Sequence, residues 1–170
     1  MDLIILRHAE KNPGFAVDPS LSTHGLEQAE ALAEILTMPR WGRPHKLFAS
    51  PKQRTQQTLR PLANKLGLPI EILPELDERR RDETGSDFQR RIDQLVDTVT
   101  ESTQIHRKRS PTLSSSMIWC SHFDWIEEFR GRIDCEEDLL RTPYDQWSPG
   151  QFIVLRSLDL WKVIGFGRAP

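Results

Sequence analysis

The chain has 170 residues, a length that fits one domain and leaves little room for a second. Its 23 basic and 25 acidic side chains give a net charge of −2, so it lacks the strongly basic balance of a general nucleic-acid binder. Its apolar runs reach about four residues, whereas a membrane-spanning helix needs roughly 20, and no secretory leader is visible. Its two cysteines, Cys120 and Cys135, form neither a disulfide framework nor a zinc-type pair. We therefore expect a single cytoplasmic domain over residues 1–170, with no membrane or nucleic-acid partner.

Short apolar runs alternate with amphipathic stretches along the chain. Residues 3–6 are apolar on both faces, which is typical of a buried strand. Residues 26–36 have apolar side chains at helical spacing, and the pair Ser22-Thr23 supplies a cap before them. Pro51 suits the first turn of the next helix, and Gly67 suits its end. In chain order, we predict strand 3–6, a helix over 26–36, strand 46–50, helix 51–66, strand 70–73, helix 88–99, strand 117–120, helix 125–132, and strands 151–156 and 160–164.

This alternation predicts an α/β sandwich with a mostly parallel central sheet. Two polar stretches, 77–87 and 102–116, are predicted to be loops. Functional sites of such sheets lie at the carboxyl ends of the strands, so the residues that follow each apolar run are the candidates. They are Arg7 and His8 after the first strand, Ser50 and Arg54 after the second, Glu75–Glu78 after the third, and Ser121 and His122 after the fourth.

These residue types suit the chemistry of a phosphoryl group. The forked guanidinium of arginine binds phosphate oxygens through paired donors, which lysine cannot do. One histidine can attack phosphorus and carry the phosphoryl group, and a second, protonated, can donate to a peripheral oxygen. A carboxylic acid can protonate the leaving oxygen and then help to activate water. The cationic groups would supply the charge that other phosphoryl-transfer sites take from magnesium, so this arrangement requires no metal.

Each candidate also has a plainer interpretation. An Arg-His pair alone is weak evidence of a site, and His122 alone could be a satisfied core histidine. Arg54 at a helix start could be a solvated charge. The functional interpretation depends on the coincidence at successive strand ends, since the plainer one must explain each residue separately.

Five segments of the chain resemble the histidine phosphatase superfamily, which has the phosphoglycerate mutase-like fold. They occur in the order of that family and run from Leu3 to about Ile126. The segments are Leu6-Arg7-His8-Ala9-Glu10, Leu21-Ser22 with Gly25, Gln28 and Ala29, Ala49-Ser50-Pro51 with Arg54-Thr55 and Gln57-Thr58, Leu76-Asp77-Glu78-Arg79, and Cys120-Ser121-His122.

The resemblance implies a role for each matching residue. His8 would be the nucleophile that becomes phosphohistidine, and Glu78 would protonate the leaving group. Arg7, Arg54 and His122 would hold the phosphoryl oxygens. The implied fold is a three-layer α/β/α sandwich with a mostly parallel sheet, and the implied site uses neither a metal nor another cofactor.

Which carboxylate is the acid stays open, because several lie in one short stretch. The register from Leu76 favours Glu78, and the others would then belong to a solvated loop. The alternatives are Glu75, Asp77, Asp82 and Glu83.

Three residues depart from the pattern of the family. Ala9 and Phe123 each stand where a glycine is usual, and Asp124 follows Phe123. We expect Phe123 to narrow the pocket or to form an apolar wall for the substrate. We expect Asp124 to point outward and to cap a helix that starts at Trp125.

The sequence thus predicts a metal-independent phosphatase that forms phosphohistidine on His8 and acts on phosphomonoesters or a phosphoprotein. Short members of the family that act on phosphohistidine tend to lack the acid, so Glu78 favours phosphomonoesters. A phosphoglycerate mutase-type transferase and an inactive phosphate-binding module are the alternatives. The basic triplet Arg79–Arg81 next to the acid is either a solvated face or a site for a second anionic group.

Overall fold

The structure is a computed structural model that describes residues 1–14, 16–109 and 115–170, with the side chains of 106–109 left out. Its elements follow the predicted alternation of strands and helices. They are β1 (Asp2–Arg7), α1 (Thr23–Leu36), β2 (Arg43–Ala49), α2 (Gln53–Leu66), β3 (Ile70–Ile72), the short 3-10 helix η1 (Pro74–Leu76), α3 (Gly85–Arg109), β4 (Ser115–Ser121), α4 (Phe123–Arg130), β5 (Gln151–Ser157) and β6 (Trp161–Arg168).

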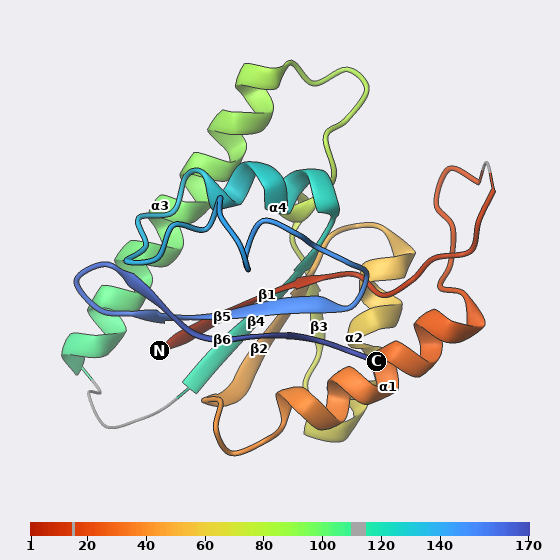
Figure 1. Cartoon of the computed structure of the whole chain (residues 1–170), viewed down its shortest axis with the longest axis horizontal. Helices are drawn as coiled ribbons and strands as arrows, with labels where there is room; N and C mark the ends of the chain where they lie inside the picture. The colour runs from red at the N-terminus through yellow and green to blue at the C-terminus, as the bar shows by residue number, and fades with distance from the viewer. Residues whose placement is uncertain (15, 110–114) are drawn as a thin grey trace.

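One six-stranded sheet in the order β3-β2-β4-β1-β5-β6 forms the middle layer. The first four of these strands are parallel, and β5 and β6 are antiparallel. Helices α1 and α2 cover one face of the sheet, and α3 and α4 cover the other (Figure 1). The predicted three-layer α/β/α sandwich with a mostly parallel sheet is therefore confirmed.

Strand β1 shows why both faces of the sheet are apolar. Leu3 and Ile5 pack into the core under α3 and α4, whereas Ile4 and Leu6 pack into the core under α1 and α2. All four side chains are fully buried. A strand covered on both faces needs a continuous apolar run rather than an alternating one, which is what the sequence of β1 provides.

The start of α2 differs from the prediction, and its end agrees with it. Pro51 precedes the helix, which begins at Gln53. The carboxylate of Asp18, from the loop after β1, accepts the backbone N–H of Gln53 at 3.0 and 3.2 Å and so serves as the cap from outside the helix. Gly67 ends α2 with φ of 65°, the left-handed backbone that glycine adopts without strain.

The predicted loop over residues 102–116 is wrong in its first part, because α3 continues to Arg109. Hydroxyl groups of this stretch bond within the helix or to the sheet, so its polarity does not end the helix. Thr103 is fully buried, and its Oγ1 lies 3.1 Å from Oγ of Ser157 in β5. Strand β4 begins directly after residues 110–114 of the predicted loop, which lie outside the described residues.

The long connection over residues 131–150 packs back onto α4 and β6. Buried Arg130 at the end of α4 donates hydrogen bonds to the carbonyls of Leu139 and Tyr144, both at 2.9 Å. The ring of Tyr144 packs edge-on against Phe166 of β6, with centroids 5.3 Å apart. These contacts fix a segment that has little regular secondary structure of its own.

Among the described residues, no helix has the length and apolar character needed to cross a membrane.

Candidate active site

The pairing of β1 with β4 brings the two predicted histidines together. Arg7 is the register partner of Ser121, and the backbone N–H of His8 donates to the carbonyl of Ser121 at 3.0 Å. The chain then turns away from both strands at the same sheet edge. The rings of His8 and His122 consequently lie with their centroids 5.3 Å apart.

The hydrogen bonding of His8 fixes its tautomer. Its Nδ1 lies 2.7 Å from the carbonyl oxygen of Ala9, which can only accept, so Nδ1 carries the proton. Nε2 therefore presents a lone pair, and it has no hydrogen-bond partner among the residues that the structure describes. Burial, with smaller contributions from Arg54 and Arg7, lowers the pKa of His8 to about 4. At neutral pH the ring is therefore uncharged.

The backbone around His8 is held from two other elements. The N–H of Ala9 donates to Oγ1 of Thr58 in α2 at 3.0 Å. The N–H of Gly150, at the end of the 131–150 connection, donates to the carbonyl of His8 at 3.1 Å. The nucleophile thus sits on a backbone that is restrained on both sides of the side chain.

The segment from Leu21 to Ala29 supports the backbone that follows His8. Oγ of Ser22 accepts the N–H of Gly25 at 3.0 Å and caps α1. A Cβ on Gly25 would lie 1.9 Å from the carbonyl oxygen of Glu10, so a glycine is needed where α1 approaches the loop after β1. The side chain of Gln28 accepts the N–H of Glu10 at 3.0 Å. The motif therefore docks α1 onto the residues that follow His8.

The hydrogen bonds of His122 fit a neutral ring in the empty site. Its Nδ1 lies 3.2 Å from Nη2 of Arg54, which can only donate, so Nε2 carries the proton and donates to Oγ of Ser50 at 2.7 Å. Burial, followed by the charge of Arg54, lowers the pKa of His122 to about 2. In the empty site the positive charge beside this ring is therefore that of Arg54.

Arg54 is the central cation of the site, and its side chain is almost fully buried. Its Nη2 donates to Oε2 of Glu78 at 2.7 Å, and its Nη1 lies 3.4 Å from Oδ1 of Asp18. Its Nε is buried without a partner among the described residues. The guanidinium therefore holds donors that a bound oxyanion can use.

Arg7 is a second guanidinium in the lining of the cavity that contains His8. Its Nη1 donates to the carbonyl of Trp147, and its guanidinium carbon lies 5.0 Å from the centre of the Phe123 ring. Burial lowers the pKa of Arg7, and the nearby carboxylate of Asp124 opposes that shift. Phe123 thus serves as a platform that orients a guanidinium toward the site.

The five predicted site residues line one cavity of about 350 Å³. The cavity opens at the carboxyl edge of the parallel strands, as the fold rule predicts. Its walls are Arg7, His8, Arg54, Glu78 and His122 together with Glu10, Lys11, Phe123, Asp124 and Pro149.

The structure separates the candidate acids. Glu78 is the one that lines this cavity. Asp77 is buried behind it, accepts the N–H of Glu78 at 3.0 Å and lies 3.7 Å from Nε2 of His122, and burial raises its pKa. Glu83 pairs with Arg91 at 2.8 Å. The geometry thus favours Glu78, with Asp77 as its neighbour.

The three departures from the family pattern have different consequences. Ala9 is fully buried and its Cβ is accommodated. Phe123 is 44% exposed at the mouth of the cavity, which agrees with an apolar wall. The expectation for Asp124 is right in one part and wrong in the other. Its Oδ1 accepts the N–H of Trp125 at 2.9 Å in the first turn of α4, which starts at Phe123. The side chain does not point outward, because Asp124 lines the cavity and its Oδ2 accepts the N–H of Arg79 at 2.8 Å.

Of the residues that hold the site together, Thr58 belongs to the segment around Arg54 that resembles the family, and it lies one turn after Arg54 on the same face of α2. The sequence analysis missed two others, Asp18 and Lys52. Asp18 carries no local pattern that distinguishes it from other loop carboxylates. Lys52 lies 3.6 Å from Oε1 of Glu78, and only the fold brings the two together.

Comparisons with known proteins agree with this geometry. Residues 3–83 match the family model of the histidine phosphatase superfamily, branch 1. A search of curated sequences gave no significant match.

Three solved structures share the fold over nearly the whole chain. The protein histidine phosphatase SixA complexed with tungstate gives a TM-score of 0.72 at 19% identity, covering 99% of this chain and 97% of that one. Mycobacterial hydrolase 1 gives 0.73 at 18% identity, with 99% of each chain covered. The mycobacterial glucosyl-3-phosphoglycerate phosphatase gives 0.68 at 18% identity, again with 99% of each covered. The match to the histidine phosphatase superfamily thus covers residues 3–83, and the likeness in fold to these three structures extends over nearly the whole chain.

Proposed function

We propose that the protein is a phosphatase that hydrolyses phosphomonoesters through a phosphohistidine intermediate on His8. The observation that carries the proposal is the unprotonated Nε2 of His8, which faces a cavity lined by Arg7 and Arg54. Each of these arginines keeps a buried Nε without a partner among the described residues. A neutral nucleophile between two guanidinium groups is suited to attack on an anionic phosphoryl group.

In the first step, Nε2 of His8 forms a bond to phosphorus while the bond to the leaving oxygen breaks. Glu78 gives its proton to that oxygen, so the leaving group departs as an alcohol. In the second step, water attacks phosphorus and the bond to Nε2 breaks. The Glu78 carboxylate accepts the proton from the water, and inorganic phosphate leaves a neutral His8.

Substrate binding itself would prepare Glu78 for its role as an acid. In the empty site Glu78 pairs with Arg54. A phosphoryl group that binds Arg54 takes over these donors and places negative charge beside the carboxyl group. Both changes favour the protonated form, which is the form that can donate.

Arg7 and Arg54 would stabilise the charge of the transferring group, and we propose that no metal takes part. The same negative charge would favour protonation of His122, which could then donate to a phosphoryl oxygen. Cys120 and Cys135 are both free, which suits the reducing cytoplasm that we propose as its location.

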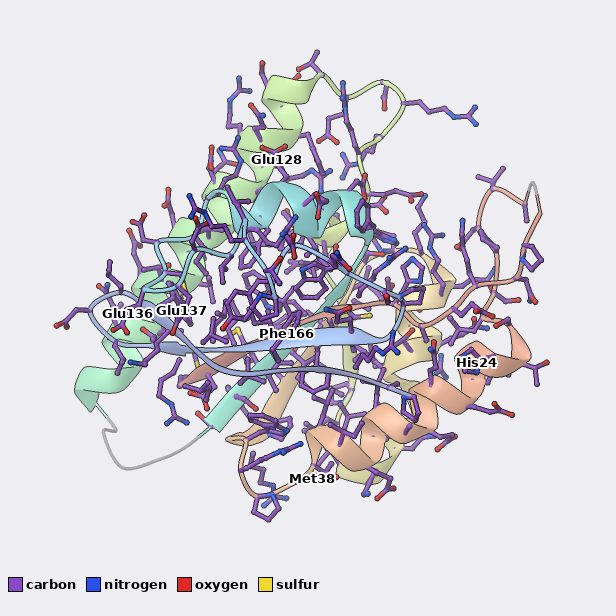
Figure 2. All side chains as sticks on the ribbon, in the orientation of Figure 1. His24, Met38, Glu128, Glu136, Glu137 and Phe166 are labelled. Atoms are coloured by element: carbon purple, nitrogen blue, oxygen red, sulfur yellow. The ribbon has the colours of Figure 1, made fainter. Side chains whose placement is uncertain are left out.

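The test is hydrolysis of 4-nitrophenyl phosphate in excess EDTA by the wild type, H8A and H24A. His24 lies on the outside of α1 (Figure 2), so H24A is a histidine control remote from the cavity. We expect turnover that survives chelation, persists in H24A and is lost in H8A. A quenched reaction should contain acid-labile phosphate bound to the wild type and not to H8A. Binding of phosphate without any turnover would favour an inactive binding module.

Two further outcomes concern the substrate and the acceptor. Isomerised phosphoglycerate without released phosphate would favour a mutase. The substrate screen also includes phosphoproteins, because the similar structure of SixA is that of a protein histidine phosphatase. Faster turnover of phosphoserine than of phosphohistidine peptides would agree with Glu78 as an acid, since a phosphoramidate needs less help with its leaving group.

A further inference from the structure

A second cavity adjoins the candidate active site. It has a volume of about 440 Å³, and its walls include Val17, Lys52 and the basic triplet Arg79–Arg81. Glu78 lines this cavity as well as the first one. The two cavities therefore share a wall at the proposed acid.

The two carboxyl oxygens of Glu78 face different partners. Oε2 is 2.7 Å from Nη2 of Arg54, and Oε1 is 3.6 Å from Nζ of Lys52 in the second cavity. An acid that protonates the leaving oxygen must lie next to the leaving group. A substrate whose phosphoryl group is held by Arg54 would therefore extend its leaving group past Glu78, toward Lys52.

The second cavity has an excess of positive charge. Its carboxylates, Asp77 and Glu78, both lie within 4.0 Å of Lys52. Within the described part of the chain, no guanidinium of Arg79–Arg81 forms an ion pair with a carboxylate. Glu83 of the same loop pairs with Arg91 at 2.8 Å, and its Oε2 accepts the backbone N–H of Arg80 at 3.2 Å.

The backbone that carries the triplet is anchored on both sides. The N–H of Arg79 donates to Asp124 of α4 at 2.8 Å. From α3, Arg91 donates to the carbonyls of Glu75 and Asp77 at 2.7 and 3.0 Å. The arginines are thus presented at a fixed place beside the acid, which distinguishes them from a charge run on a free loop.

We propose that the second cavity binds a second anionic group, a carboxylate or a phosphate, on the leaving group of the substrate. Arg80, Arg81 and Lys52 are its recognition residues. The proposal rests on the proposed function, because it assigns the leaving-group side of the same site. A small phosphomonoester with an acidic leaving group and a phosphopeptide with acidic flanks both carry this chemistry.

The experiment compares matched substrates. One pair is 4-nitrophenyl phosphate and the same ester with a carboxylate on a methylene arm of the ring. The other pair is a phosphoserine peptide flanked by glutamine or by glutamate. We expect the wild type to have a higher kcat/KM for the anionic member of at least one pair, and that pair identifies the source of the anionic group.

The variant R80A/R81A removes two of the three exposed arginines without touching the lining of the first cavity. We expect kcat/KM for the preferred anionic substrate to fall about tenfold, and that for its neutral counterpart to stay within about twofold. The control R43A/K46A removes the same charge from exposed positions in the first half of β2, away from the carboxyl ends of the strands. It should leave both kcat/KM values unchanged.

Equal effects of R80A/R81A on both members of each pair would overturn the proposal, as would the absence of any preference in the wild type. A binding measurement separates this failure from failure of the proposed function. If no ester is hydrolysed, calorimetry with H8A and the two nitrophenyl esters still applies. Tighter binding of the carboxylated ester, lost in H8A/R80A/R81A, would support the second site, and equal binding would overturn it.

Discussion

Nη2 of Arg54 donates to Oε2 of Glu78 across 2.7 Å. In the empty site, the proposed phosphate anchor and the proposed acid therefore satisfy one another. An oxyanion that binds Nη2 of Arg54 displaces the carboxylate of Glu78 from it. Because of this competition, Glu78 should weaken the binding of an oxyanion and yet assist turnover. The two effects can be measured separately.

The first prediction concerns binding. E78Q keeps the shape of the side chain and removes the charge that competes for Arg54, so it should bind inorganic phosphate or vanadate several-fold more tightly than the wild type. Titration calorimetry measures this directly. D82N, in the exposed loop nearby, is the control and should bind as the wild type does. Weaker binding by E78Q would mean that the carboxyl group donates to the oxyanion in the complex.

The second prediction concerns the rate. E78Q should lower kcat by about 10²-fold for an alkyl phosphate, whose leaving oxygen needs a proton, because a general acid typically contributes 10²- to 10⁴-fold. The loss should be much smaller for 4-nitrophenyl phosphate, whose leaving group departs as an anion. Steady-state kinetics on the two esters tests whether Glu78 protonates the leaving oxygen. An equal loss of kcat on both esters would mean that another group supplies this proton.

The third prediction concerns stability against pH. The folded pKa values of His8 and His122, about 4 and about 2, lie below the ordinary value of 6.5. The unfolded chain therefore binds more protons as the solution is acidified. The stabilisation from the neutral rings is fully present above pH 6.5 and is lost as the pH falls toward these folded values.

Each ring should contribute a slope of up to roughly 1.4 kcal/mol per pH unit to the free energy of unfolding between pH 6 and pH 4. Urea titrations followed by tryptophan fluorescence measure this slope. H8N and H122N should each flatten it relative to the wild type. An unchanged slope in both variants would show that the rings are protonated in the folded protein.

The fourth prediction concerns the docking of α1 onto the loop after β1. G25A should lower the free energy of unfolding by about 2 kcal/mol, because the added Cβ cannot fit beside the carbonyl of Glu10. It should also reduce turnover, since Glu10 follows His8 by two residues. G131A is the matched control, with no neighbour closer than 3.8 Å to the added Cβ. Similar thermal denaturation of the two variants would contradict the close approach.

Much of the fold could be predicted because the strands are buried on both faces. The continuous apolar run of β1 and the helical spacing of α1 reflect burial that local sequence records. The prediction was wrong for α3 beyond residue 102, where Thr103 is buried against Ser157 of a distant strand. A contact of that kind is invisible to a pattern of polarity along the chain.

The sequence predicted which residues come together at the candidate site. It did not predict their protonation states or the residues that support them. His8 and His122 follow strands that the parallel topology places side by side. The neutral state of His122 depends on burial and on the position of Arg54, which are properties of the folded chain. Asp18 caps α2 and forms an ion pair with Arg54 only because the loop after β1 folds back onto the start of α2.

The register of β1 and β4 has a consequence for assays of folding. A slip of two residues between these strands would keep every apolar side chain on its own face, so burial alone penalises it weakly. The same slip would move His122 about 7 Å along the strand direction from His8, since each residue advances by about 3.3 Å. Catalytic turnover is therefore a sensitive readout of strand alignment, and a refolded sample with native-like secondary structure but no activity should be suspected of carrying shifted strands.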